Sequence, residues 1–367
     1  MKKIDHKMVG FILTIILLLL CPHFAFSLEN SVELTDVGIG ARSVALGNVI
    51  TGIADDASAV FINPAGLGLQ NRMSFISMST QLLTDVDYKV LGFAYPTRFG
   101  TFGIGYIGAT TPAGDNIHME GSITVEGGPI YYSNEMLVLS YGCDISPIVN
   151  DVFFDTPAII TGLSAGANFK LLSQKFSGDI SNPPSASGMQ ADIGVIYKAT
   201  EKLSIGAMAQ NVYRGSAGES ITWSTDEKEK LPTSITTGCS LKATDNITFV
   251  VGSNSPLGTS QKTGYGFGVE WQIIPLIALR AGVSIQDESA LSEVHDMVSK
   301  PSIGLGVNYA GFRFDYAYKH DLEFSDLSTS YFSIGYVGMP ILTEIPSEME
   351  EGPLEISTGP VIEGELE

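Results

Sequence analysis

The sequence predicts an all-β, transmembrane outer-membrane β-barrel of about 14 antiparallel strands with a small N-terminal helical plug. Three observations support this. Residues 73–338 alternate apolar and polar side chains with a period of two, which indicates strands. Hydrophobic residues make up 44% of the chain, charged residues 16%, and there are 40 glycines, whereas a soluble chain usually carries more charge. Short and long connections alternate between the strands, as in outer-membrane barrels.

Residues 1–27 have the pattern of a secretory signal peptide. Three lysines precede an apolar segment, 9–20, that is too short to span a bilayer comfortably. Small residues at Ala25 and Ser27 offer a cleavage site. Cys21 raises the alternative of a lipoprotein, but Leu20 fits that signal poorly. Export to the cell envelope follows from either reading.

Residues 28–72 are predicted to form the plug. Residues 41–46 are compatible with a short helix that ends at Gly47. Asp55 and Asp56 stand where an N-cap and a first-turn carboxylate belong. Asn63 can cap a further turn with Pro64 at its first position. The segment is rich in Ala, Gly and Ser, so it can pack closely against a surrounding wall.

Three runs in this segment, 40–47, 54–59 and 63–67, carry a family resemblance. The segment resembles the N-terminal region of the PorV/PorQ family of outer-membrane proteins and, more loosely, of the FadL family of hydrophobic-compound channels. The resemblance implies a plug inside the periplasmic end of a 14-stranded barrel. An arm packed on some other β domain is the alternative. The plug motif comprises Arg42, Asp55, Asp56, Asn63, Pro64 and Gly66.

The barrel, residues 73–338, is expected to contain strands with tight turns at one end and long loops at the other. The predicted strands span 73–83, 88–96, 101–108, 134–143, 159–173, 187–198, 202–212, 233–242, 246–253, 263–272, 276–285, 301–309, 311–319 and 329–338. Long loops are expected at 109–133, 174–186, 213–232, 286–300 and 320–328. The connection at 144–158 is also long, although it falls at the tight-turn end.

One face of each strand is apolar and the other is rich in glycine and charge. Phe312, Phe314 and Tyr316, for example, alternate with Arg313 and Asp315. This predicts an apolar face toward lipid and a polar face toward the lumen. The predicted lumen-lining residues are Lys170, Asp192, Glu270, Arg280, Arg313, Asp315 and Lys319. They are interpreted as structural ion pairs or, alternatively, as substrate contacts.

Two hypotheses concern the inside of the barrel. Asp55 and Asp56 either pair with Arg280 and Arg313 or merely cap a short helix. The glycine-rich strands at 103–105 and 266–268 are expected to carry any bulge that opens the wall.

Residues 339–367 are predicted to be an acidic, disordered periplasmic tail. Residues 338–367 contain eight glutamates, four prolines and no Lys or Arg. The net charge of the whole chain is −20, which argues against a nucleic-acid partner.

No catalytic motif is found, so the chain is not expected to be an enzyme, and no cofactor or metal is expected. His118, His295 and His320 lack metal-ligand spacing. Outer-membrane lipid is the expected partner, in the bacterial outer membrane. Three functions stay open: passive transport of small hydrophobic molecules, an accessory role in type IX secretion with secretion-system proteins as partners, and a structural barrel without cargo.

Overall fold

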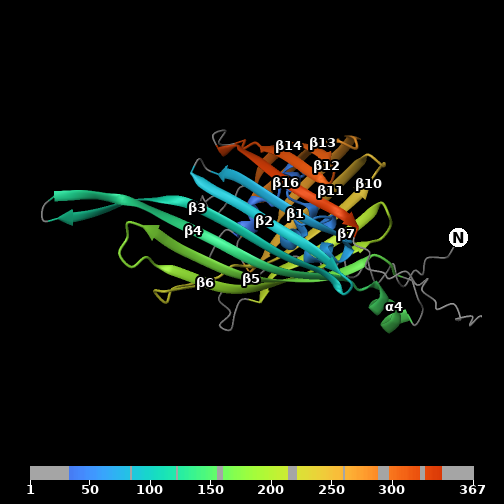
Figure 1. The fold of residues 1–367 in the computed structure, drawn as a ribbon, viewed down its shortest axis with the longest axis horizontal. Coiled ribbons are helices and arrows are strands. Elements are labelled where there is room, and N and C mark those ends of the chain that lie inside the picture. Colours follow the sequence, from blue (N-terminus) through green and yellow to red (C-terminus); the bar gives the residue numbers. More distant parts are fainter. Residues whose placement is uncertain are drawn as a thin grey trace, which may run out of the picture.

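The computed structural model is a closed antiparallel β-barrel (Figure 1). It describes residues 33–82, 85–120, 123–154, 160–213, 221–258, 261–287, 297–322 and 327–340. The predicted signal peptide lies outside the described residues, as does the predicted tail apart from its first two residues. Within the described residues, no helix is long and apolar enough to cross a membrane.

Fourteen of the described strands make up the barrel wall, which confirms the predicted fold. They are β1 (Arg72–Leu82), β2 (Val86–Thr97), β3 (Gly100–Glu120), β4 (Ile123–Asp144), β5 (Leu163–Gly178), β6 (Ser185–Lys198), β7 (Leu203–Tyr213), β10 (Thr233–Lys242), β11 (Ile247–Leu257), β12 (Gly264–Ile274), β13 (Ile277–Asp287), β14 (Met297–Tyr309), β15 (Phe312–Lys319) and β16 (Thr329–Pro340). Consecutive wall strands pair antiparallel, and pairing of β1 with β16 closes the ring. β8 (Ile221–Trp223) and β9 (Lys228–Glu229) form a small hairpin that pairs with β6 at the end of the barrel opposite the tight turns, which we call the outer end. The hairpin is not part of the wall, where β7 pairs directly with β10.

The predicted loop at 109–133 is wrong, because β3 and β4 continue beyond the barrel as a two-stranded ribbon (Figure 1). Their pairing runs on from Thr110 with Ser133 to Glu120 with Ile123. Exposed side chains predominate in the described part of the ribbon at 110–117. A ribbon with water on both faces lacks the apolar–polar alternation that marks a strand in sequence.

The long connection at the opposite end of the barrel holds a helix. This helix, α4 (Ser146–Phe154), lies between β4 and β5. Its first turn is capped by Asp144, whose Oδ1 accepts a hydrogen bond of 2.8 Å from the Ser146 backbone N–H. The tight turns between the wall strands lie at this same end.

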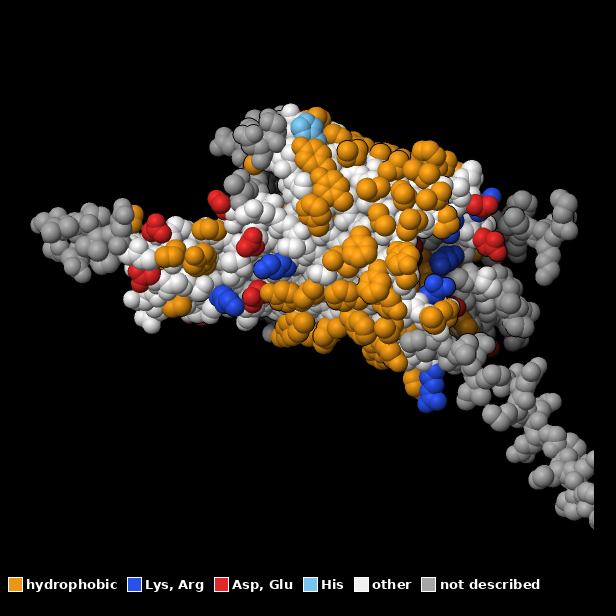
Figure 2. Space-filling view, turned by 45° about the horizontal axis from the view of Figure 1, so that its top comes forward, with side chains coloured by type: hydrophobic (Ala, Val, Ile, Leu, Met, Phe, Trp, Pro, Cys, Tyr) orange, Lys and Arg blue, Asp and Glu red, His pale blue; other side chains and the backbone are white. Residues whose placement is uncertain are grey.

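Outward side chains form an apolar belt around the wall, and Figure 2 shows this belt on one face as a band of hydrophobic side chains. Phe267 and Phe314 are half exposed, whereas the inward residues Asp315 and Ala317 are buried. The apolar-out assignment is therefore confirmed. Exposed aromatic residues near the tight turns complete the belt at that edge, and they include Tyr95, Phe102, Trp271, Tyr309 and Phe312.

Residues 33–71 form the described part of the plug, which lies inside the barrel. Its elements are η1 (Leu34–Val37), α2 (Ala41–Ala45), η2 (Ile50–Gly52), α3 (Ala59–Ile62) and η3 (Pro64–Leu69). Helix α2 packs against β13 to β16, η2 against β7, β10 and β11, and η3 against β3 to β6. The plug therefore contacts the wall around most of its circumference.

Inward glycines let the plug backbone touch the wall. A Cβ atom added at Gly282 would lie 2.6 Å from the Gly47 backbone nitrogen, and one at Gly268 would lie 2.6 Å from the Leu46 carbonyl oxygen. The same holds for Gly166, where a Cβ would lie 2.3 Å from the Pro64 carbonyl carbon. These distances are shorter than any real Cβ contact, so a larger residue has no room there.

The glycines at 103–105 and 266–268 serve this packing, and the prediction of bulges at these places is wrong. Strand pairing through both stretches is regular. A described irregularity within the wall instead lies between β6 and β7. There the register shifts between Ala191 and Ile193, and Asn211 has a positive φ of 56°.

Candidate functional site

A cluster of seven charged side chains joins the plug to the wall near the tight-turn end of the barrel. We call this cluster the latch. Its members are Arg42, Asp55 and Asp56 of the plug and Glu270, Arg280, Arg313 and Asp315 of the wall. The latch contains three cations and four carboxylates. It thus combines three plug-motif residues with four of the predicted lumen-lining residues.

Arg42 and Glu270 make the first connection between plug and wall. The Arg42 Nε donates to Glu270 Oε2 at 2.9 Å, and its Nη2 donates to Oε1 at 3.0 Å. This two-point contact fixes the orientation of both groups. A third Arg42 nitrogen, Nη1, donates to Asp55 Oδ1 at 2.6 Å.

The wall residues continue the latch across three strands. Arg280 of β13 donates to Glu270 Oε2 of β12 and to Asp315 Oδ1 of β15, each at 2.7 Å. Arg313 Nε lies 3.2 Å from Asp315 Oδ2, close enough for an ion pair but without hydrogen-bond geometry. Arg280 and Asp315 are buried, so each depends on its partners to offset desolvation.

Asp56 makes the second connection and also stabilises the turn that leads into α3, whose N-cap is Ser58. Its Oδ2 pairs with Arg313. Its Oδ1 accepts a hydrogen bond of 2.8 Å from the Ser58 backbone N–H. Asp55, in contrast, pairs with Arg42 inside the plug, and Arg280 contacts wall carboxylates instead of the plug acids.

The latch also shifts the pKa values of two of its plug residues, Arg42 and Asp55. Desolvation lowers the pKa of Arg42, but the Asp55 and Glu270 carboxylates outweigh it and raise that pKa well above its ordinary value. Desolvation likewise raises the pKa of Asp55, but Arg42 and Arg313 outweigh it, so the net shift is downward. Both groups therefore stay charged near neutral pH.

Lys170 and Asp192 belong to a second buried cluster, farther from the tight turns. The Lys170 Nζ lies 2.8 Å from Glu33 Oε1, 2.8 Å from Asp192 Oδ1 and 2.6 Å from Asn211 Oδ1. An ammonium group has three protons, so these three acceptors use all of them. The Asn211 backbone N–H also donates to Asp192 Oδ1 at 2.8 Å.

The remaining predicted residues have separate places. Lys319 lies at the outer end of β15, with Nζ 5.8 Å from the centre of the Tyr331 ring. Asn63 caps η3, since its Oδ1 accepts from the Ala65 backbone N–H at 3.1 Å. Pro64 is buried as the first residue of η3, and Gly66 packs against the Ala54 backbone.

Beyond the plug, one set of strands contributes a group of apolar side chains to the inner face of the barrel, and another set contributes a group of polar side chains. Strands β1 to β5 contribute apolar side chains that share one cluster with Leu34 of the plug. These side chains are Met78, Tyr88, Val90, Ile107, Met136 and Leu172. Strands β7, β10, β11 and β13 instead contribute Gln210, Thr236, Asn254, Ser284 and Gln286.

Neither the apolar nor the polar group on this inner face was predicted from the sequence, and Glu33 and Asn211 were not identified. The sequence does contain a signal for the polar group. Thr236, Asn254 and Ser284 each stand two residues from an inward glycine, on the same face of the strand and toward its outer end.

The comparisons with solved structures agree on the fold. The Ralstonia pickettii toluene transporter TbuX aligns with a TM-score of 0.55 at 14% identity, covering 82% of this chain and 99% of that chain. The CymD monoaromatic hydrocarbon channel aligns with a TM-score of 0.55 at 13% identity, covering 86% and 100%. The P. putida toluene transporter TodX aligns with a TM-score of 0.51 at 14% identity, covering 82% and 97%.

The barrel and its short N-terminal helices therefore share the fold of these solved structures. A family model matches residues 31–341, and the chain belongs to that family, the uncharacterised protein family UPF0164. No curated protein matches the sequence. The resemblance to the PorV/PorQ family, and the secretion role that it implies, stay predictions.

Proposed function

We propose that this chain is a bacterial outer-membrane channel for the passive transport of small hydrophobic molecules. The observation that carries the proposal is the group of apolar side chains that β1 to β5 direct into the barrel. Met136 and Leu172 are buried inside the barrel and belong to one apolar cluster with Leu34 of the plug. A water-filled porin has a polar interior instead.

Two further observations support this function. The exposed apolar belt fits insertion of the wall into lipid. The similar solved structures include a toluene transporter and a monoaromatic hydrocarbon channel, although identities near 14% extend to the fold alone. In this proposal, the signal peptide directs export and the plug controls access from the periplasm.

Native mass spectrometry of the barrel purified from bacterial outer membranes tests ligand binding. We expect wild-type barrel to carry small apolar molecules, and the double variant Met136→Gln/Leu172→Gln to lose them. The matched control Met136→Leu keeps the wall apolar and should retain them. Wild-type barrel without bound ligand, or equal retention in all three proteins, would contradict the proposal.

A further inference from the structure

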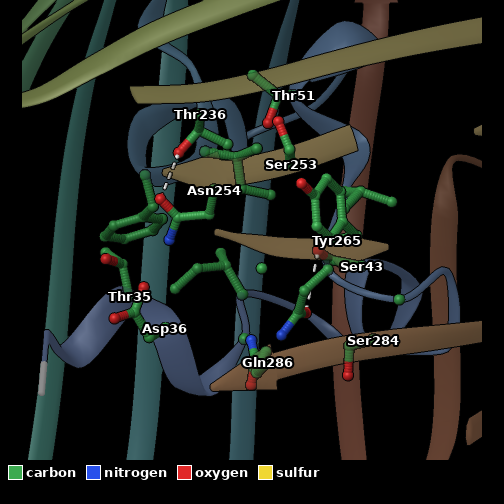
Figure 3. Close-up of a pocket in the computed structure, with 18 of the residues that line it drawn as sticks. Thr35, Asp36, Ser43, Thr51, Thr236, Ser253, Asn254, Tyr265, Ser284 and Gln286 are labelled. Carbon is green, nitrogen blue, oxygen red and sulfur yellow. Dashed lines mark hydrogen bonds between the residues drawn. The ribbon is translucent and has the colours of Figure 1, made fainter. Parts of the chain in front are cut away.

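A cavity of about 90 Å³ lies between the plug and the polar group of side chains on the inner wall. Figure 3 shows labelled residues of both the plug and the wall around it. The inward side chains that the wall contributes are Gln210, Thr236, Asn254, Ser284 and Gln286, and the plug contributes Thr35, Asp36, Ser43, Asn48 and Thr51. Most of these side chains carry a hydroxyl or an amide, so the cavity offers both donors and acceptors of hydrogen bonds.

The hydrogen bonds within this lining are weak enough to be exchanged for a ligand. The Thr236 Oγ1 lies 3.4 Å from Gln210 Oε1 and 3.4 Å from Asn254 Oδ1. The Ser43 Oγ lies 3.5 Å from Asn48 Oδ1. Hydroxyl hydrogen bonds are normally 2.5–3.0 Å long. A ligand group that makes shorter bonds can therefore replace these contacts.

The charges around the cavity disfavour an anion. Asp36 lines the cavity with a carboxyl group. Lys170, which interacts electrostatically with Asp36, has its three protons taken by Glu33, Asp192 and Asn211. A bound carboxylate would face the Asp36 carboxyl group without gaining a new cationic partner.

The cavity, at about 90 Å³, is large enough to hold several water molecules or the small polar end of a ligand. Apolar side chains of Ile39, Val49, Phe61 and Ile62 also line it. Ile39 further belongs to the apolar cluster that reaches β1 to β5. A ligand can thus place its polar end here and its apolar part against that cluster.

We infer that this cavity binds the uncharged hydrogen-bonding group, an alcohol or an amide, of an otherwise apolar ligand, and that it disfavours carboxylates. The inference rests on the proposed function and narrows its substrate class. Together, the polar cavity and the apolar group on β1 to β5 would select molecules that are mostly apolar but carry one weakly polar group.

Calorimetric titration of the full chain in lipid nanodiscs, with empty nanodiscs as the blank, tests the inference. The probes are toluene, benzyl alcohol and benzoate at about pH 8, above the pKa of Asp36. One additional hydrogen bond contributes about 1 kcal/mol, or about a fivefold change in Kd. We expect benzyl alcohol to bind about fivefold more tightly than toluene, and benzoate to bind most weakly. The double variant Asn254→Leu/Gln286→Leu should lose the preference for the alcohol while still binding toluene.

The variant Gln174→Leu is the matched control, because Gln174 is a buried residue of β5 that does not line the cavity. It should keep the ratio of the two dissociation constants. Equal binding of toluene and benzyl alcohol to the wild type would overturn the inference and leave the proposed function intact. Benzoate as the tightest ligand would also overturn it. Failure of all three probes to bind would overturn both.

Discussion

At the scale of single residues, Asp56 combines a hydrogen bond within a turn and an ion pair in one side chain. One oxygen accepts from the Ser58 backbone, and the other pairs with Arg313 of the wall. The sequence predicted an N-cap at Asp55 and Asp56, which is wrong, because the N-cap of α3 is Ser58 and makes no side-chain capping hydrogen bond. The sequence limited the ion-pair partner of Asp56 to Arg280 or Arg313, two inward arginines near the tight turns. It could not decide between them, because the pairing depends on how the plug sits in the barrel.

The variant Asp56→Asn separates these two contributions. Asparagine can still accept the hydrogen bond from the Ser58 backbone N–H but loses the charge that pairs with Arg313. We expect the plug to loosen, with a loss of about 1–3 kcal/mol in plug docking, read as faster amide deuterium exchange in α3. Asp144→Asn is the control, since Asp144 caps α4 outside the barrel. Wild-type exchange in Asp56→Asn would show that the ion pair is unimportant.

Asp36 gives the plug a dependence on pH. Desolvation and the Glu33 carboxylate raise its pKa from 3.8 to about 7, against the opposing effect of Lys170. A folded-state pKa above the unfolded value means that the neutral carboxyl is favoured in the docked plug. Its contribution to stability is therefore complete below about pH 4 and is lost as the pH rises through about 7.

We accordingly expect η1 to exchange deuterium faster at about pH 8 than at about pH 6, after correction for intrinsic exchange rates. In Asp36→Asn this difference should disappear, because the side chain no longer titrates. Persistence of the same difference in the variant would assign it to another group.

At the scale of elements, the inward glycines of the wall strands fit the path of the plug. Gly264 and Gly268 lie on the same strand and the same face. A Cβ at Gly268 would be 2.6 Å from the Leu46 carbonyl oxygen, whereas one at Gly264 would have its nearest neighbour at 3.3 Å. The sequence showed the glycines but not their purpose, because spacing alone does not distinguish a bulge from a close approach.

Gly268→Ala should therefore displace the plug, and Gly264→Ala should leave it in place. The displacement should appear as increased single-channel conductance in planar bilayers and as protease cleavage within the plug. Overpacking of this kind costs about 1–3 kcal/mol. Identical behaviour of the two variants would contradict the observed path of the plug.

A second pair of variants compares the cost of an arginine on the outward face of β12 with its cost on the inward face of the neighbouring strand β11. Phe267 is half exposed in the middle of β12, and Asn254 of β11 faces the cavity. Phe267→Arg should destabilise the barrel by about 2–4 kcal/mol near the bilayer midplane. Asn254→Arg should cost much less, because water in the lumen can hydrate it. Urea unfolding in lipid vesicles measures both, and equal losses would refute the apolar-out assignment.

At the scale of the whole molecule, the wall was predictable and the arrangement inside it was not. Strands such as β12 and β15 followed directly from alternation, since their outward faces must be apolar in lipid. The ribbon of β3 and β4 was missed because it leaves the belt and loses that alternation. The sequence predicted the members of the latch as inward charges and plug residues. Only the three-dimensional arrangement shows which of them pair with Glu270 and Asp315, and that Lys170 belongs to a separate cluster.

The combination of an apolar group and a polar group in the lumen is also a property of the whole molecule. Apolar residues such as Leu172 and polar residues such as Asn254 come from strands on different sides of the ring. Each strand by itself shows only an inward face of mixed character. The selectivity that we propose therefore arises from barrel closure and from the plug together.

Uptake of radiolabelled toluene tests the central claim most directly, in bacterial cells whose outer leaflet contains lipopolysaccharide. Cells producing the wild-type barrel should take up toluene faster than cells without it, and Met136→Leu should behave like the wild type. The variant Met136→Gln/Leu172→Gln, folded and present at the same level, should reduce uptake toward that of cells without the barrel. Equal uptake with and without the wild-type barrel would contradict the claim that its apolar lumen is a path for hydrophobic molecules.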